Sequence, residues 1–114
     1  MVHTAAVAEI GALVGDPARA NMLAALLDGR ALTAKELSER AGVAPQTASG
    51  HLAKLVAAGL IEMTQQGRSR YHRLGSPEIA QMLESIMTVA GMARERSRPA
   101  RVGPADMALR TART

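Results

Sequence analysis

Apolar residues recur at intervals of three and four along the first half of the chain, the spacing of helices that bury one face. Four such stretches lie at residues 4–14, 16–28, 33–42 and 45–58. Further on, residues 61–65 and 71–74 alternate between apolar and polar, as strands do. A last helical stripe contains Ile79, Met82, Leu83, Ile86, Met87 and Ala90. The pattern predicts the order helix, helix, helix, helix, β-hairpin, helix, with no internal repeat.

Capping residues mark where these helices begin and end. Thr33 and Glu36 have the spacing of a capping box, and Gly42 can adopt the left-handed conformation that ends a helix. Pro45 suits the first turn of the next helix, so only three residues separate the two. This predicts a helix-turn-helix at residues 33–58. Helix starts with an N-cap residue followed by proline are also present at Asp16-Pro17 and Ser76-Pro77.

The second helix of this unit has a polar face opposite its apolar stripe. At about 100° per residue, the polar face contains Gln46, Thr47, Gly50 and Lys54, with Ser49 and His51 at its margins. In the major groove, Gln can make two hydrogen bonds to adenine, and Lys can bond to guanine or phosphate. Ser and Thr can bond to either base of a pair. Gly50 lets the helix approach its target closely. We interpret this face as a reader of the DNA major groove; a merely solvated helix face is the alternative.

The predicted hairpin has a positively charged tip, with Arg68 and Arg70 beside Gly67. Glu62 is the only acid between Lys54 and Arg73. Arginines on a hairpin can reach the phosphate backbone or the minor groove while a helix occupies the major groove. A charged tip that only keeps the hairpin soluble is the alternative. Next to the polar helix face, we favour contact with double-stranded DNA.

Thr33 offers a further candidate contact, because helix N-termini bind phosphate.

The net charge of +4 is unevenly distributed. Residues 1–93 carry eight basic and eight acidic side chains, while residues 94–114 carry six Arg against Glu95 and Asp106. The chain has no Cys, which excludes disulfides, thiolate metal sites and thiol switches. No apolar run approaches the roughly 18 residues of a membrane span, and no signal-peptide pattern is present. We therefore expect a cytoplasmic protein without membrane contact.

Three stretches in fixed order carry a family resemblance. They are Gly15-Asp-Pro-Ala-Arg, Ala48-Ser-Gly-His-Leu-Ala-Lys-Leu-Val-Ala-Ala-Gly-Leu-Ile and Gly67-Arg-Ser-Arg-Tyr-His-Arg-Leu. Over residues 15–74 the chain resembles the ArsR-type family of winged helix-turn-helix transcriptional repressors. The resemblance implies a mainly α fold with a small β-hairpin wing and a homodimer that packs its first and last helices across a two-fold axis. It also implies a palindromic operator, with Gln46, Thr47 and Ser49 reading bases and the wing touching the backbone.

The chain departs from the metal-sensing branch of that family. Such members carry a Cys-x-Cys type motif at the third helix, where this chain has Ala34-Lys-Glu-Leu-Ser. Others place Asp, His and Glu ligands on the last helix, where this chain has Gln81, Glu84 and Ser85 without histidine. We therefore expect the chain to belong to a branch of the family without the usual metal-binding motifs. Its effector would then be a small molecule that the sequence does not identify.

Other chemistry is not indicated. The three histidines are expected to lie far apart, with His3 in a mobile terminus, His51 on the second helix of the helix-turn-helix and His72 on a strand of the wing. Zinc needs three or four convergent ligands, so we predict no metal site and no cofactor. The methionines could offer thioethers to Cu(I), but Met more often fills irregular cores. Ser49 and His51 lack an orienting carboxylate, so we predict no enzyme and no catalytic residue.

The domain organisation follows from where the helical pattern ends. We expect a winged helix-turn-helix DNA-binding and dimerisation domain at residues 1–93, a basic linker at 94–104, and the start of a further helix at 105–114. That last helix is unfinished, which suggests that the chain is the front part of a longer protein. The predicted function is a sequence-specific, homodimeric repressor. The alternative is a winged-helix protein-protein interaction module that uses the same polar face to grip a partner.

Overall fold

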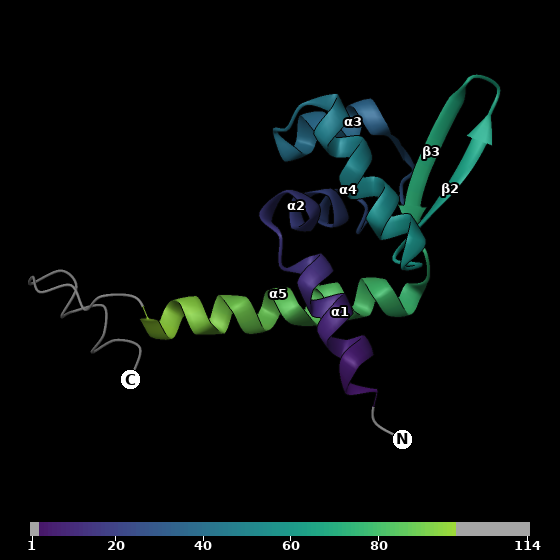
Figure 1. The fold of residues 1–114 in the computed structure, drawn as a ribbon. Coiled ribbons are helices and arrows are strands. Elements are labelled where there is room, and N and C mark those ends of the chain that lie inside the picture. Colours follow the sequence, from purple (N-terminus) through teal and green to yellow (C-terminus); the bar gives the residue numbers. More distant parts are fainter. Residues whose placement is uncertain (1–2, 98–114) are drawn as a thin grey trace, which may run out of the picture. The chain divides into compact units, whose positions relative to one another are not determined.

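The computed structural model describes residues 3–97 and has the predicted winged helix-turn-helix architecture (Figure 1). The elements follow the order α1 (Thr4–Val14), α2 (Pro17–Ala25), β1 (Leu32–Thr33), α3 (Ala34–Ala41), α4 (Pro45–Ala57), β2 (Ile61–Gln66), β3 (Ser69–Leu74) and α5 (Pro77–Ser97). Residues up to Glu84 form one compact unit, and the rest of α5 belongs to a second. The helix-turn-helix of α3 and α4 and the wing of β2 and β3 lie in the first unit.

The predicted caps are present at the helix ends. The Asp16 carboxylate accepts a hydrogen bond from the Arg19 N–H at 3.0 Å and so begins α2. Thr33 and Glu36 form the capping box of α3, and Gly42 ends that helix in the left-handed conformation at φ 67°. Pro45 occupies the first turn of α4. The turn between α3 and α4 is therefore set by local sequence, which fixes where the polar face of α4 begins.

A single core joins α2, α3, α4 and the first half of α5. Its buried members are Met22, Leu23, Leu26, Leu32, Leu37, Ala48, Leu52, Leu55, Leu60, Ile61 and Leu83. From α4 it takes Ala48, Leu52 and Leu55, the stripe expected from the sequence. Half-buried Ile79 and Met82 of α5 pack against the same cluster. Because one side of α4 is anchored in this core, the opposite side must face outward.

The sheet has one more strand than expected. Its order is β1-β3-β2 and both pairings are antiparallel, with Leu32 opposite His72 and Thr33 opposite Tyr71. A strand of two residues has no periodicity to recognise, so β1 depends on its pairing with β3. The imidazole Nδ1 of His72 lies 3.2 Å from the Leu32 carbonyl oxygen, and His72 is only 6% exposed. This predicted wing histidine is thus a structural link between the two strands.

The wing strands are also longer than predicted. Gln66 pairs with Ser69, which leaves a two-residue turn at Gly67 and Arg68. Gly67 has φ 61°, a conformation that two-residue hairpin turns require and that glycine adopts without strain. The longer pairing makes a hairpin whose tip lies away from the helices of the first unit (Figure 1).

Helix α5 differs from the expectation at its end. It continues to Ser97, into the segment assigned to the linker from residue 94. Glu and Arg favour helices, so the charged residues at 94–96 can extend one. The rest of the predicted linker, and the predicted helix at 105–114, lie outside the described residues. None of the described helices is long and apolar enough to cross a membrane.

Candidate nucleic-acid interface

The outward side of α4 presents the polar side chains expected from the sequence. Gln46, Thr47, Ser49 and Gly50 are all exposed, and they lie within the first half of the helix. The N-cap residue Ala44 makes no side-chain hydrogen bond to the first turn. Free N–H groups at a helix N-terminus attract anions such as phosphate. This feature was missed from the sequence, although an alanine at the N-cap position is a readable signal for it.

Gly50 has no structural reason to be glycine. A Cβ added to it would meet nothing within 4 Å, and its φ is not positive. Glycine in a helix interior costs roughly 1 kcal/mol relative to alanine. A close approach of α4 to a partner surface would account for a glycine at this exposed position.

Gly50→Ala is therefore expected to raise the free energy of unfolding by about 0.5–1 kcal/mol while weakening binding to DNA. Stability can be measured by urea unfolding, and affinity by fluorescence anisotropy with a DNA duplex selected from a random pool. Gly91→Ala in α5 is the control for stability, because an added Cβ is equally unhindered there. A Gly50 variant that is stabilised and binds unchanged would show that α4 does not approach DNA closely at this residue.

The wing presents unpaired positive charge. Arg68 lies in the turn and Arg70 opposite Gln65, and both are exposed. Within residues 3–97, neither guanidinium has a hydrogen bond or ion pair to another side chain. Arginines without carboxylate partners are free to contact phosphate.

His51 does not point to the reading face. Its Nδ1 lies 3.0 Å from an Arg19 guanidinium nitrogen, and its Nε2 lies 3.8 Å from the Asp16 carboxylate. The His51 side chain is only 18% exposed. Residue 51 lies at the edge of the polar face of α4, on the side next to the start of α2. His51 therefore holds α4 against α2, and its contact with DNA stays a prediction.

Arg19 connects this contact to α1. Its Nε donates to the Leu13 carbonyl at 2.7 Å, and a terminal nitrogen donates to the Ala12 carbonyl at 3.3 Å. Its positive charge thus stabilises the C-terminal end of α1. The Arg19 backbone N–H is the main cause that lowers the pKa of the Asp16 carboxyl, and its charge acts in the same direction. The sequence showed Arg19 only as one residue of a motif. Its contact with His51 could not be predicted, because the two residues lie far apart along the chain.

Thr33 is occupied by its own cap. Its hydroxyl lies 3.0 Å from a Glu36 carboxylate oxygen and accepts the Glu36 N–H at 3.2 Å. That carboxylate also accepts the Thr33 N–H at 2.9 Å, which is the main cause that lowers the Glu36 pKa. An ionised carboxylate at the start of α3 repels phosphate. The Thr33 hydroxyl is thus engaged within the capping box of α3, and its phosphate contact stays a prediction.

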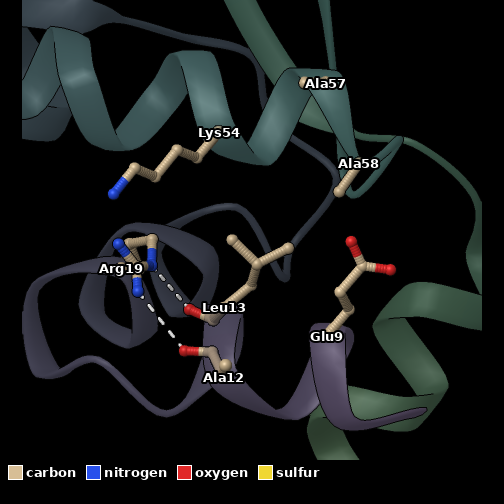
Figure 2. Close-up of a pocket in the computed structure, with 7 residues that line it drawn as sticks. All are labelled: Glu9, Ala12, Leu13, Arg19, Lys54, Ala57 and Ala58. Carbon is tan, nitrogen blue, oxygen red and sulfur yellow. Dashed lines mark hydrogen bonds between the residues drawn. The ribbon is translucent and has the colours of Figure 1, made fainter. Parts of the chain in front are cut away.

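Lys54 lies on the flank of α4 that faces α1 (Figure 2). There it lines a cavity together with Arg19 and Glu9. The contact of Lys54 with DNA stays a prediction, and we define the candidate reader as four exposed residues in the first half of α4, Gln46, Thr47, Ser49 and Gly50.

No group of three His, Asp or Glu side chains within the described part of the chain could hold a metal ion.

Comparisons with known proteins agree with this architecture. A family described as "Helix-turn-helix domain" matches residues 14–64. The uncharacterized HTH-type transcriptional regulator YdfF of Bacillus subtilis is 42% identical over 91 residues, covering 80% of this chain and 40% of YdfF. The chain therefore spans about two fifths of the length of that relative. The HTH-type transcriptional regulator CmtR of Mycobacterium tuberculosis is 32% identical over 88 residues, covering 77% of this chain and 74% of CmtR.

Solved structures show the same fold. The cadmium metal-sensor CmtR aligns with a TM-score of 0.61 at 30% identity, over 73% of this chain and 85% of CmtR. The homodimeric winged helix-turn-helix domain of Mb0332 from Mycobacterium bovis, a possible ArsR-family transcriptional regulator, aligns with a TM-score of 0.74 at 22% identity, over 86% of this chain and 90% of that domain. By its sequence relatives and its fold, the chain belongs to the ArsR-type family of winged helix-turn-helix, DNA-binding transcriptional regulators.

Proposed function

We propose that the chain binds a palindromic operator as a homodimer and represses transcription from it in the cytoplasm. The observation that carries this proposal is the combination of an exposed polar face on α4 with the unpaired arginines of the wing. The first can enter the major groove while the second meets the phosphate backbone.

The reader set of this proposal is Gln46, Thr47, Ser49 and Gly50. These are short side chains on the first half of α4, the part of a recognition helix that enters the groove first. The uncapped N-terminus of α4 adds a phosphate contact that positions the helix without reading sequence. Base contacts then supply the sequence preference.

Exposed apolar residues support the homodimer. Val7 of α1 is 66% exposed, and the other large exposed side chains on helices predicted to dimerise are Ile86, Met87, Val89 and Met92 of α5. Exposed apolar patches on small domains usually mark interaction sites. The Mb0332 domain, which shares this fold, is homodimeric. Dimerisation would cover these side chains and present two copies of α4 to the DNA.

Selection of bound duplexes from a random pool tests the proposal. The expected result is a palindrome whose half-sites are separated by about one helical turn of DNA, 10–10.5 base pairs. Lack of enrichment at low salt would favour the alternative, a winged-helix module that grips another protein. Salt dependence also separates the two, because phosphate contacts release counterions and protein docking releases far fewer.

Arg68→Ala is expected to weaken binding to all DNA sequences and to reduce the slope of log K against log salt by about one. The reason is that Arg68 lies in the exposed wing turn without an ionic partner in the described residues. Affinities at several salt concentrations, measured on operator and random duplexes, give the slope.

Arg30→Ala is the matched control for this prediction. Arg30 is also an exposed arginine, in the loop between α2 and β1, but it pairs with Asp28 at 2.6 Å. The slope should therefore stay unchanged in this variant. An Arg68 variant with the original slope would place the wing away from the DNA backbone.

A further inference from the structure

A cavity of about 490 Å³ lies where α1, the start of α2 and the end of α4 meet (Figure 2). Its lining residues are Glu9, Ala12, Leu13, Arg19, Lys54, Ala57 and Ala58. All belong to the first compact unit of the chain. The volume is within the range of small-molecule sites, roughly 300–1,000 Å³. None of these residues belongs to the candidate reader, so the cavity is a second place for a ligand.

The cavity has opposite charges at its two ends. Figure 2 shows Lys54 and Arg19 at one end and the Glu9 carboxylate at the other, with Leu13 between them and Ala57 and Ala58 toward the Glu9 end. Within residues 3–97, neither Glu9 nor Lys54 makes a side-chain hydrogen bond or ion pair. These two charges are thus available to a ligand, whereas the short apolar side chains leave room for an aliphatic body.

We propose that this cavity binds a small zwitterion with a carboxylate at one end, an ammonium group at the other and an aliphatic chain between them. Its carboxylate would meet Lys54 and Arg19, and its ammonium group would meet Glu9. Charge-assisted hydrogen bonds of this kind are stronger than neutral ones. The cavity extends over about one helical turn of each helix, roughly 6 Å along the axis, from Lys54 to Ala58 in α4 and from Glu9 to Leu13 in α1. This length sets the size of the ligand.

Arg19 gives the cavity a connection to the recognition helix. The same guanidinium that lines the cavity contacts His51 of α4 at 3.0 Å and the carbonyls that end α1. A ligand carboxylate at Arg19 competes with His51 for its N–H groups and loosens α4 from α2. This second step rests on the proposed function, because only an operator-binding protein would report it as a change in DNA affinity.

Isothermal titration calorimetry without DNA tests the site, with 6-aminohexanoate as the probe. Hexanoate and hexylamine are the matched ligands that each lack one charge. The zwitterion is expected to bind at least about tenfold more tightly than either of these ligands. Hexanoate lacks the charge-assisted contact to Glu9, and hexylamine lacks the charge-assisted contact to Lys54 and Arg19. No heat from the zwitterion at millimolar concentration, or equal affinity for all three ligands, would overturn the proposal.

Two variants locate the binding. In Glu9→Gln the zwitterion and hexanoate should bind alike. In Lys54→Met the advantage of the zwitterion over hexylamine should shrink, because Arg19 is then the only remaining partner of the carboxylate. Glu78→Gln and Lys35→Met remove exposed charges that do not line the cavity, and they should keep the original preference. Circular dichroism checks that each variant is folded. Unchanged preferences in Glu9→Gln and Lys54→Met would show that the probe binds elsewhere.

Operator affinity measured with and without 6-aminohexanoate then tests the second step. If calorimetry shows binding and the chain selects no operator, the proposed function fails while the site stands. If an operator is selected and calorimetry shows nothing, the site fails alone. A ligand that binds the cavity and leaves operator affinity unchanged would overturn the connection through Arg19.

Discussion

Gly75→Ala is expected to lower the free energy of unfolding by about 1–3 kcal/mol, the range for an added group in a close-packed position. A Cβ at residue 75 would overlap the backbone carbonyl of Gly59 and would lie 3.2 Å from Ile79 Cδ1. The Gly75 N–H also donates to the Leu60 carbonyl at 3.0 Å, so this backbone cannot move away freely. Relief of the overlap must separate the end of the wing from the end of α4.

Urea unfolding followed by circular dichroism measures this loss. Gly11→Ala in α1 is the matched control, because an added Cβ there meets nothing within 4 Å. That variant should be as stable as the original or slightly more so. If Gly75→Ala unfolds at the original urea concentration, the backbones at Gly59 and Gly75 are not in close contact in solution.

The helix ends could be predicted because their determinants are local. Asp16, the capping box of α3 and Gly42 each act within four residues, so their chemistry can be read directly from neighbouring letters. Gly59, which follows the C-cap residue Ala58 of α4, adopts φ 78°. The turn of the helix-turn-helix therefore followed from sequence alone.

The features that sequence reasoning missed depend on residues far apart in the chain. Strand β1 exists through its pairing with β3, some 40 residues away. The 100° rule placed His51 at the margin of a face, but could not say that Arg19 and Asp16 lie beside that margin. The same rule could not show that α1 approaches the flank of α4 that carries Lys54. Helical periodicity tells on which side of its own helix a residue lies. Which other element packs against that side depends on the tertiary structure.

These long-range contacts hold α4 from several sides. Its apolar stripe is buried in the core, His51 ties its middle to Arg19, and Gly75 contacts the turn at its end. What is left exposed near its N-terminus is the polar face. A rigidly held helix can present short side chains to DNA with little loss of side-chain entropy, which favours base readout by residues such as Gln46.

Gln46→Ala is expected to weaken operator binding by about 1–3 kcal/mol and to relax the preference at one base position in each half-site. The reason is that an exposed Gln in the first turn of α4 can make two hydrogen bonds to one adenine, which alanine cannot replace. Anisotropy titrations with operators that carry each of the four bases at every half-site position measure the change.

Gln81→Ala removes an exposed glutamine from α5 and should leave the base preference unchanged. The pattern of the loss matters more than its size. If Gln46→Ala loses affinity equally for all DNA sequences, residue 46 contacts the DNA backbone and not a base. If the variant keeps its full base preference, Gln46 does not belong to the reader. In that case Thr47 and Ser49 would have to carry the base contacts, because they are the other exposed hydrogen-bonding side chains of the candidate reader.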